Sequence, residues 1–113
     1  RGTSQDEFVM FVEVDRRHPD LPIIIGHGMG EDGLRLAAQT RNIHLELSGS
    51  YPERDAVRKA IDQIGADRVV FGTDLDMITP AFALGVYDEA NMTPDEERLV
   101  MAENARRILR VPG

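Results

Sequence analysis

The chain alternates between segments with the period of a helix and short apolar runs typical of strands. Ser4 and Glu7 form a capping-box pattern ahead of Phe8 and Phe11, which predicts a helix at the start of the chain. The run Ile23-Ile24-Ile25 is wholly apolar and β-branched, as in an interior parallel strand. We expect helices at residues 4–17, 34–42 and 52–64, after Pro80 and from Thr93, and strands at residues 23–25, 43–48 and 69–71.

The second predicted strand differs from the other two because apolar and polar residues alternate along it. One face carries Ile43, Leu45 and Leu47, and the other face carries His44, Glu46 and Ser48. Helices flank this strand in the sequence, so we expect its polar face to line an interior lumen rather than to meet water. His44 and Glu46 are then groups of the lumen or neighbours of a site.

This alternation of helices and strands predicts an α/β fold in which the three strands are parallel. Their carboxyl ends, at His27, Ser48 and Asp74, then lie at one pole. Three parallel strands alone leave both sheet edges unpaired and bury little of their faces. A complete eight-stranded βα barrel needs about 250 residues, so residues 1–113 form one partial domain of somewhat less than half that size. We expect the remainder to be missing, separate, or supplied by a second copy.

Composition narrows the classes of partner. With 13 Lys and Arg against 20 Asp and Glu, the net charge of −7 disfavours nucleic acid and anionic membranes. No apolar run approaches the length of a membrane helix. The absence of cysteine excludes disulfides and thiolate metal sites and fits a reducing compartment, so we expect a cytoplasmic protein with a small-molecule substrate.

His27 and Asp74 are the candidate catalytic residues, because each follows the carboxyl end of an apolar strand. A carboxylate such as Asp74 can hold a divalent metal, which lowers the pKa of bound water, and an imidazole such as His27 can move its protons. Taken singly, both residues have ordinary structural explanations. A histidine at a strand end is often a hydrogen-bonding residue, and an aspartate there is often a helix cap or turn former.

The small number of possible metal ligands limits the catalysis that we expect of this chain alone. A zinc site takes three or four ligands from His, Cys, Asp or Glu, whereas this chain has three histidines. One of them, His18, is expected at the opposite pole, at the solvated end of the first helix. We therefore expect the isolated chain to be inactive.

Residues 28–33 also match the glycine pattern of dinucleotide-binding loops, between a predicted strand and a predicted helix. Glu31 and Asp32 stand where a pyrophosphate would meet the helix N-terminus, and their carboxylates would repel it. An acidic loop at a helix start is the simpler interpretation, and nucleotide binding stays a weaker alternative.

Four stretches in order resemble the C-terminal part of the amidohydrolase-related family, the metal-dependent TIM-barrel hydrolases and decarboxylases that include aminocarboxymuconate-semialdehyde decarboxylase. These stretches are residues 22–30, 42–49, 64–74 and 103–109, so the resemblance covers nearly the whole chain.

The resemblance implies that the three strands are the sixth, seventh and eighth of a TIM (β/α)8 barrel. It also implies that His27 activates metal-bound water or contacts substrate, and that Asp74 binds the metal, zinc or manganese. The family's remaining ligands, on strands one and five, have no counterpart here. Family members often carry proline at the position of Asp76, and an aromatic residue and an aspartate at His44 and Glu46.

The function that follows is hydrolysis or non-oxidative decarboxylation of a small carboxylated substrate by the complete protein, with Asp74 on the metal and His27 on the proton. An alternative from a different class is a non-catalytic α/β module that binds a partner through its unpaired strand edges.

Overall fold

The computed structural model describes residues 5–26, 30–47, 55–72, 84–85, 87–88 and 90–110. Helices and strands alternate as predicted, and the helix from Thr93 is present. Residues 84–85 and 87–88 are helical, as predicted for the short helix after Pro80, although the start of that helix and the predicted helix start at Pro52 lie outside the described residues. The elements are α1 (Gln5–Arg17), β1 (Ile23–Ile25), α2 (Gly30–Ala38), β2 (Ile43–Glu46), α3 (Ala56–Ile64), the 3-10 turn η1 (Ala66–Arg68), β3 (Val69–Val70), α5 (Pro94–Arg98), the π-helical segment η2 (Leu99–Glu103) and α6 (Asn104–Leu109).

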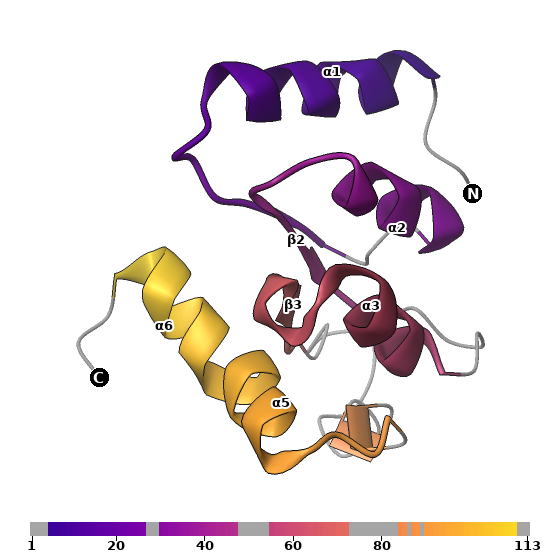
Figure 1. The fold of residues 1–113 in the computed structure, drawn as a ribbon, viewed down its shortest axis with the longest axis vertical. Coiled ribbons are helices and arrows are strands. Elements are labelled where there is room, and N and C mark those ends of the chain that lie inside the picture. Colours follow the sequence, from indigo (N-terminus) through magenta and orange to yellow (C-terminus); the bar gives the residue numbers. More distant parts are fainter. Residues whose placement is uncertain are drawn as a thin grey trace.

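The three strands form one parallel sheet in the order β1-β2-β3, which confirms the predicted parallel arrangement. Ile23 pairs with Ile43, and further along the sheet Glu46 pairs with Val70. Helices α1, α2 and α3 follow one another along the sheet, and η2 and α6 lie next to β3 (Figure 1). In a parallel sheet this order places all three carboxyl ends along one edge, which we call the carboxyl edge.

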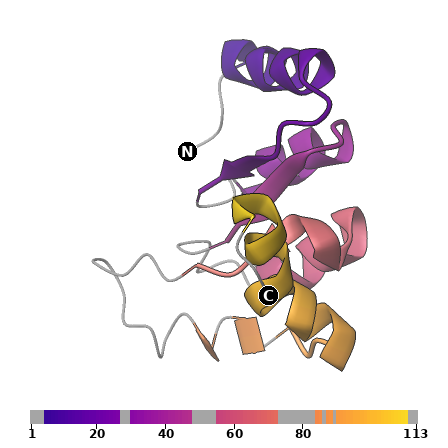
Figure 2. The same ribbon diagram turned by 90° about the vertical axis from the view of Figure 1, so that its left-hand side faces the viewer.

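The two faces of the sheet have different environments. Ile43, Leu45 and Val69 are completely buried in a cluster with apolar residues of α2 and α3, which lie on the same side of the strands (Figure 2). The opposite face carries His44, Glu46 and Val70, together with Ile24, whose side chain is 41 % exposed. The predicted alternation along residues 43–47 is therefore confirmed, and the helix-facing side is buried more completely than three strands alone would allow.

Helix α3 ends at Gly65, as its sequence predicted. The N–H of Gly65 donates to the carbonyl of Ile61 at 2.9 Å, and its φ of 91° is a conformation that favours glycine. A Cβ at this position would lie 2.7 Å from a carboxylate oxygen of Asp67, so the turn from α3 into η1 and β3 depends on the glycine.

Helix α5 begins with the predicted capping box. The Thr93 hydroxyl accepts from the N–H of Glu96 at 3.2 Å, and the Glu96 carboxylate accepts from the N–H of Thr93 at 3.0 Å. The same carboxylate forms a salt bridge with Arg58 of α3 at 3.0 Å, and this guanidinium lowers the pKa of Glu96 to about 2. The cap therefore also fastens α5 to α3.

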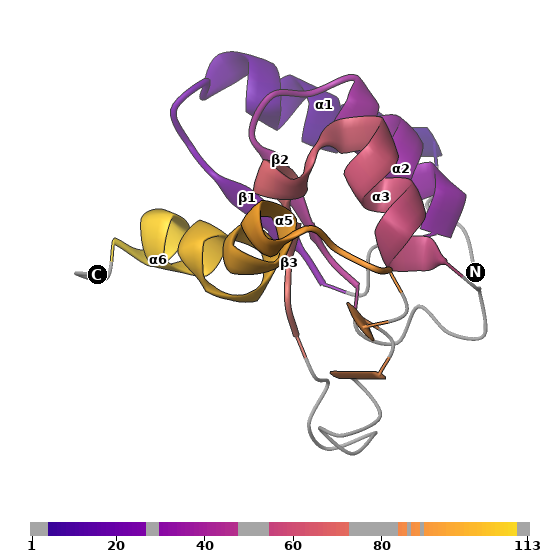
Figure 3. The same ribbon diagram turned by 60° about the horizontal axis from the view of Figure 1, so that its bottom comes forward.

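The free edge of β3 is closed by the same C-terminal segment (Figure 3). The N–H of Phe71 donates to the carbonyl of Val100 at 3.0 Å, and the Asn104 amide donates to the carbonyl of Val69 at 2.8 Å. A π-helical turn such as η2 changes the helix hydrogen-bond pattern, which leaves a carbonyl available for this contact. The expectation that both edges are unpaired is thus wrong for β3, because a helix segment takes the place of a neighbouring strand.

Among the described residues, no helix is both long and apolar enough to cross a membrane.

Candidate functional site

The carboxyl edge is the part of the fold where the candidate catalytic residues were predicted to lie. Gly26 follows β1, Leu47 follows β2, and Phe71 and Gly72 follow β3. Both candidate catalytic residues come next in the chain, His27 directly after Gly26 and Asp74 two residues after Gly72. His27 and Asp74 themselves lie outside the described residues, as does Ser48, so their roles stay predictions.

Glu46 is a carboxylate that the structure describes at this edge. If Gly72 carried a Cβ, that atom would lie 2.1 Å from Oε2 of Glu46 and 2.4 Å from its Cδ. A Cβ on Gly26 would lie 3.8 Å from Oε1 of the same side chain. The half-buried carboxylate therefore lies on the backbone of Gly72 and faces Gly26, between the ends of β3 and β1.

Tyr87 holds the ends of β2 and β3 together. Its hydroxyl accepts from the N–H of Leu47 at 3.0 Å and donates to the carbonyl of Val70 at 3.0 Å. The ring is 1 % exposed and packs edge to face on Phe71, with centroids 5.0 Å apart. Burial raises the pKa of Tyr87 well above its usual range, so the hydroxyl keeps its proton and serves as a structural bridge.

No local pattern in the sequence indicates the role of Tyr87. Its partners are separated from it by 17 and 40 positions, and no periodic pattern connects them. The available signal was chemical, since a buried tyrosine must find hydrogen-bond partners for its hydroxyl.

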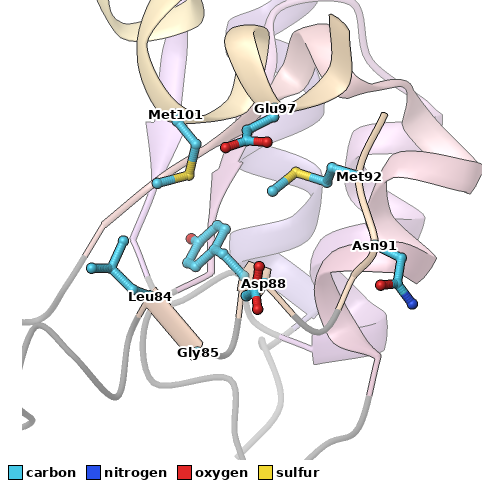
Figure 4. Close-up of a pocket in the computed structure, with 8 residues that line it drawn as sticks. Leu84, Gly85, Asp88, Asn91, Met92, Glu97 and Met101 are labelled. Atoms are coloured by element: carbon cyan, nitrogen blue, oxygen red, sulfur yellow. The ribbon is translucent and has the colours of Figure 1, made fainter. Parts of the chain in front are cut away.

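A pocket of about 390 Å³ lies next to this bridge and shares Tyr87 with the carboxyl edge (Figure 4). Two carboxylates, from Asp88 and Glu97, and two methionine side chains give it a mixed acidic and apolar lining, with no histidine among the lining residues that the structure describes. Its size suits a small ligand. The lining residues are Leu84, Gly85, Tyr87, Asp88, Asn91, Met92, Glu97 and Met101.

His44 lies toward the amino end of β2, away from the carboxyl edge. Its Nδ1 lies 2.9 Å from the carbonyl of Asn42, and its Nε2 lies 3.1 Å from a guanidinium nitrogen of Arg107. The carbonyl can only accept, so Nδ1 carries the proton and Nε2 accepts from the arginine. Burial, together with the Arg107 charge, lowers the pKa of His44 and keeps the ring neutral. Both ring nitrogens are used by the protein, which leaves this histidine a structural role.

The third histidine, His18, is exposed just after the end of α1, as the sequence predicted. Within the described ranges no three potential ligands from His, Asp and Glu come together in a metal site. Glu46 is a described carboxylate at the end of β2, the strand between the two strands that precede His27 and Asp74. The dinucleotide pattern at residues 28–33 also stays a prediction, since Gly28 and Met29 are not described.

Comparison with known proteins shows a solved structure that shares this fold. A search of curated protein sequences gives no significant match. The crystal structure of 2,6-dihydroxybenzoate decarboxylase in complex with 2,6-dihydroxybenzoate matches with a TM-score of 0.73 and 22 % sequence identity, over 96 % of this chain and 42 % of that enzyme. The likeness shows a shared fold, and the chain spans less than half the length of the decarboxylase.

The sequence model of the family described as amidohydrolase matches residues 3–111, almost from one end of the chain to the other. This family consists of barrel enzymes, and a parallel sheet with flanking helices is the arrangement that part of such a barrel would have. On this evidence the chain belongs to the amidohydrolase family.

Proposed function

We propose that this chain is the C-terminal portion of a divalent-metal-dependent barrel enzyme that hydrolyses or decarboxylates a small carboxylated substrate. Strands β1, β2 and β3 would be the sixth, seventh and eighth of the barrel. The family supports an enzyme of the hydrolase and decarboxylase kind, and the structural neighbour that shares its fold is a decarboxylase.

The observation that carries the proposal is the order of the three parallel strands. β1 and β3 are separated by β2 alone, so the two strands end two strand spacings apart, about 10 Å. His27 is the second residue after β1 in the sequence, and Asp74 is the fourth residue after β3. We propose that both act on one small ligand. In parallel α/β enzymes this edge carries the active site, whereas the opposite edge is concerned with stability.

In this proposal Asp74 supplies a carboxylate ligand to zinc or manganese, and His27 holds and moves the proton of the reaction. The metal, when bound, makes hydroxide available near neutral pH and polarises a substrate oxygen. The further ligands come from another part of the complete protein or from a second copy, because one carboxylate and one histidine do not make a catalytic site. Histidine suits proton transfer because its ordinary pKa lies near neutrality.

A non-catalytic module that binds a partner through its strand edges is the alternative. Val100 and Asn104 bond to backbone groups on the free edge of β3, so pairing of β3 with a further strand, of a partner or of a complete barrel, would have to displace these contacts. These contacts therefore do not distinguish the two hypotheses.

The test is turnover by the full-length protein with a panel of carboxylated amides, esters and aryl acids, in the presence of zinc or manganese. His27→Gln and Asp74→Asn should each reduce kcat/KM by at least about 100-fold, the lower range for loss of a proton-transfer group. His18→Gln is the matched control, because this histidine is exposed at the end of α1. Full turnover in both site variants would refute the assignment.

A further inference from the structure

We propose that the pocket lined by Tyr87, Asp88 and Glu97 binds a linear aliphatic diamine in its doubly protonated form. The pocket holds about 390 Å³, a volume within the range of cavities that take small organic ligands. A diamine is opposite in charge to the carboxylated substrate of the proposed function, so this inference goes beyond that function and does not rest on it.

The charge of the pocket is the first support. Its lining includes the carboxylates of Asp88 and Glu97, and no lysine, arginine or histidine is among the lining residues that the structure describes. Figure 4 shows the two carboxylates on opposite sides of the pocket, with the side chains of Met92 and Met101 to either side of the space between them. Two negative groups with no cation between them attract a cation with two charges and repel a carboxylated molecule.

The second support is that these two acids lack the arginine partners of the acids around them. Between residues 88 and 103, the described acids that do not line the pocket each form a salt bridge at 2.8 to 3.0 Å: Asp95 with Arg98, Glu96 with Arg58, and Glu103 with Arg106. No described cation forms an ion pair with Asp88 or Glu97. The charges that the chain itself leaves unbalanced in this segment therefore face the pocket.

The apolar part of the lining defines the rest of the ligand. Met92, Met101 and the exposed Leu84 contribute thioether and aliphatic surface. Methionine side chains adapt their shape to an apolar partner. A divalent metal ion instead needs several oxygen ligands, and the described residues contain no group of three side chains that could hold one. The ligand that fits both parts of the lining has a chain of methylene groups with an ammonium group at each end.

The experiment compares 1,4-diaminobutane with butylamine, which share a four-carbon chain and differ by one ammonium group. Binding to the full-length protein at low ionic strength is followed by NMR of ¹³C-labelled methionine methyl groups. The signals of Met92 and Met101 should shift on titration, and that of Met10 on α1 should not, because Met10 does not line this pocket. The wild type should bind the diamine about fivefold more tightly, the increment of one further ion pair at an exposed carboxylate.

Substitution of each carboxylate should remove this preference. Glu97→Gln and Asp88→Asn should each lower the affinity for the diamine to about that for butylamine, because each removes one of the two charges. Glu103→Gln and Asp95→Asn are the matched controls. They make the same changes at acids that are paired with arginines and do not line the pocket, so both should keep the preference.

Gly85→Lys tests the same pocket without removing a carboxylate. Gly85 lines the pocket, a Cβ added to it would meet no atom within 4 Å, and no positive φ requires glycine there. The new ammonium group should compete with the ligand for the two carboxylates and lower the affinity for the diamine at least about fivefold. Gly85→Gln, which is uncharged and of similar reach, should lower it less.

Three results would overturn the inference: equal affinity of the wild type for the two probes, no shift of the Met92 and Met101 signals, or a preference that is unchanged in Glu97→Gln or in Asp88→Asn. Failure of the proposed function looks different. Diamine binding does not involve the metal and should persist in Asp74→Asn, whereas a wrong proposed function would appear as full turnover in that variant, whatever the pocket binds.

Discussion

The sheet has an amino edge, where its three strands begin, and a carboxyl edge, where they end. The two edges use polar side chains in different ways. At the amino edge, the buried Asp15 accepts from the N–H groups of Arg41 and Asn42 at 3.0 and 2.9 Å, just before β2. Arg68 donates to the carbonyl of Thr40 at 2.9 Å. At the carboxyl edge, the carboxylate of Glu46 lies against the backbone of Gly72.

The difference shows how one small sheet can separate stability from chemistry. Side chains at the amino edge are committed to the backbone of their own chain, because each satisfies groups that would otherwise be buried without partners. Among the described residues of the carboxyl edge, the Tyr87 hydroxyl bridges Leu47 and Val70 and holds the ends of β2 and β3 together. Substitutions should therefore reduce stability at the first edge and binding at the second.

The largest effect on stability should come from Asn104→Leu. The Asn104 side chain is fully buried and donates to the carbonyls of Ala66 and Val69 at 2.7 and 2.8 Å, so leucine leaves both without this donor. We expect the free energy of unfolding in urea to fall by about 3 kcal/mol. The exposed Gln63→Ala should change it by no more than about 0.5 kcal/mol. Equal stability of the two variants would refute the role of Asn104 in closing the edge of β3.

Tyr87→Phe should cost somewhat less, about 2 kcal/mol in the same measurement, because the N–H of Leu47 and the carbonyl of Val70 lose their shared partner. This variant could break the comparison, since Tyr87 lies at the carboxyl edge and yet is structural. If it weakens ligand binding at unchanged stability, the hydroxyl acts on the ligand and not as a bridge.

Asp15→Asn should reduce the free energy of unfolding by about 1 kcal/mol, because an amide offers one acceptor oxygen to the two N–H groups that the carboxylate now binds. Asp20→Asn is the matched control, an exposed aspartate nearby, and should be neutral. Binding of aryl acids should be unchanged in both variants. A loss of binding in Asp15→Asn would show that the two edges are coupled.

The smallest effect is a pH dependence from His44, whose pKa is lower in the folded protein than in the unfolded chain because the ring is buried. The unfolded chain therefore takes up a proton first as pH falls. The contribution of His44 to stability is complete above about pH 6.5 and declines below it. His44→Gln should flatten the stability profile below about pH 6.5, and a profile whose slope is unchanged in this variant would contradict the role of His44.

Much of the fold follows from local sequence signals. Ile23-Ile24-Ile25, the alternation from Ile43 and the capping box at Thr93 are each written within a few consecutive residues, and each appears as predicted. The closed edge of β3 does not follow in this way. It depends on a contact between Phe71 and Val100 and on a π-helical turn, neither of which has a local pattern.

The same distinction between local sequence signals and contacts of distant segments applies to the candidate site. Glu46 was predicted on a polar face because alternation is a local signal, but its place on Gly72 depends on the pairing of β2 with β3. The bridging role of Tyr87 depends on the ends of β2 and β3, which lie far from Tyr87 in the sequence. His27 and Asp74 were named from strand ends and family resemblance, and their roles stay predictions.

The most direct test of the central claim, that the carboxyl edge carries metal-dependent chemistry, is elemental analysis of the purified full-length protein and its Asp74→Ala variant. The account predicts near-stoichiometric zinc or manganese in the wild type and its loss in the variant, with the free energy of unfolding measured for both. Equal metal content in the two proteins, or a wild type without metal after loading, would contradict it.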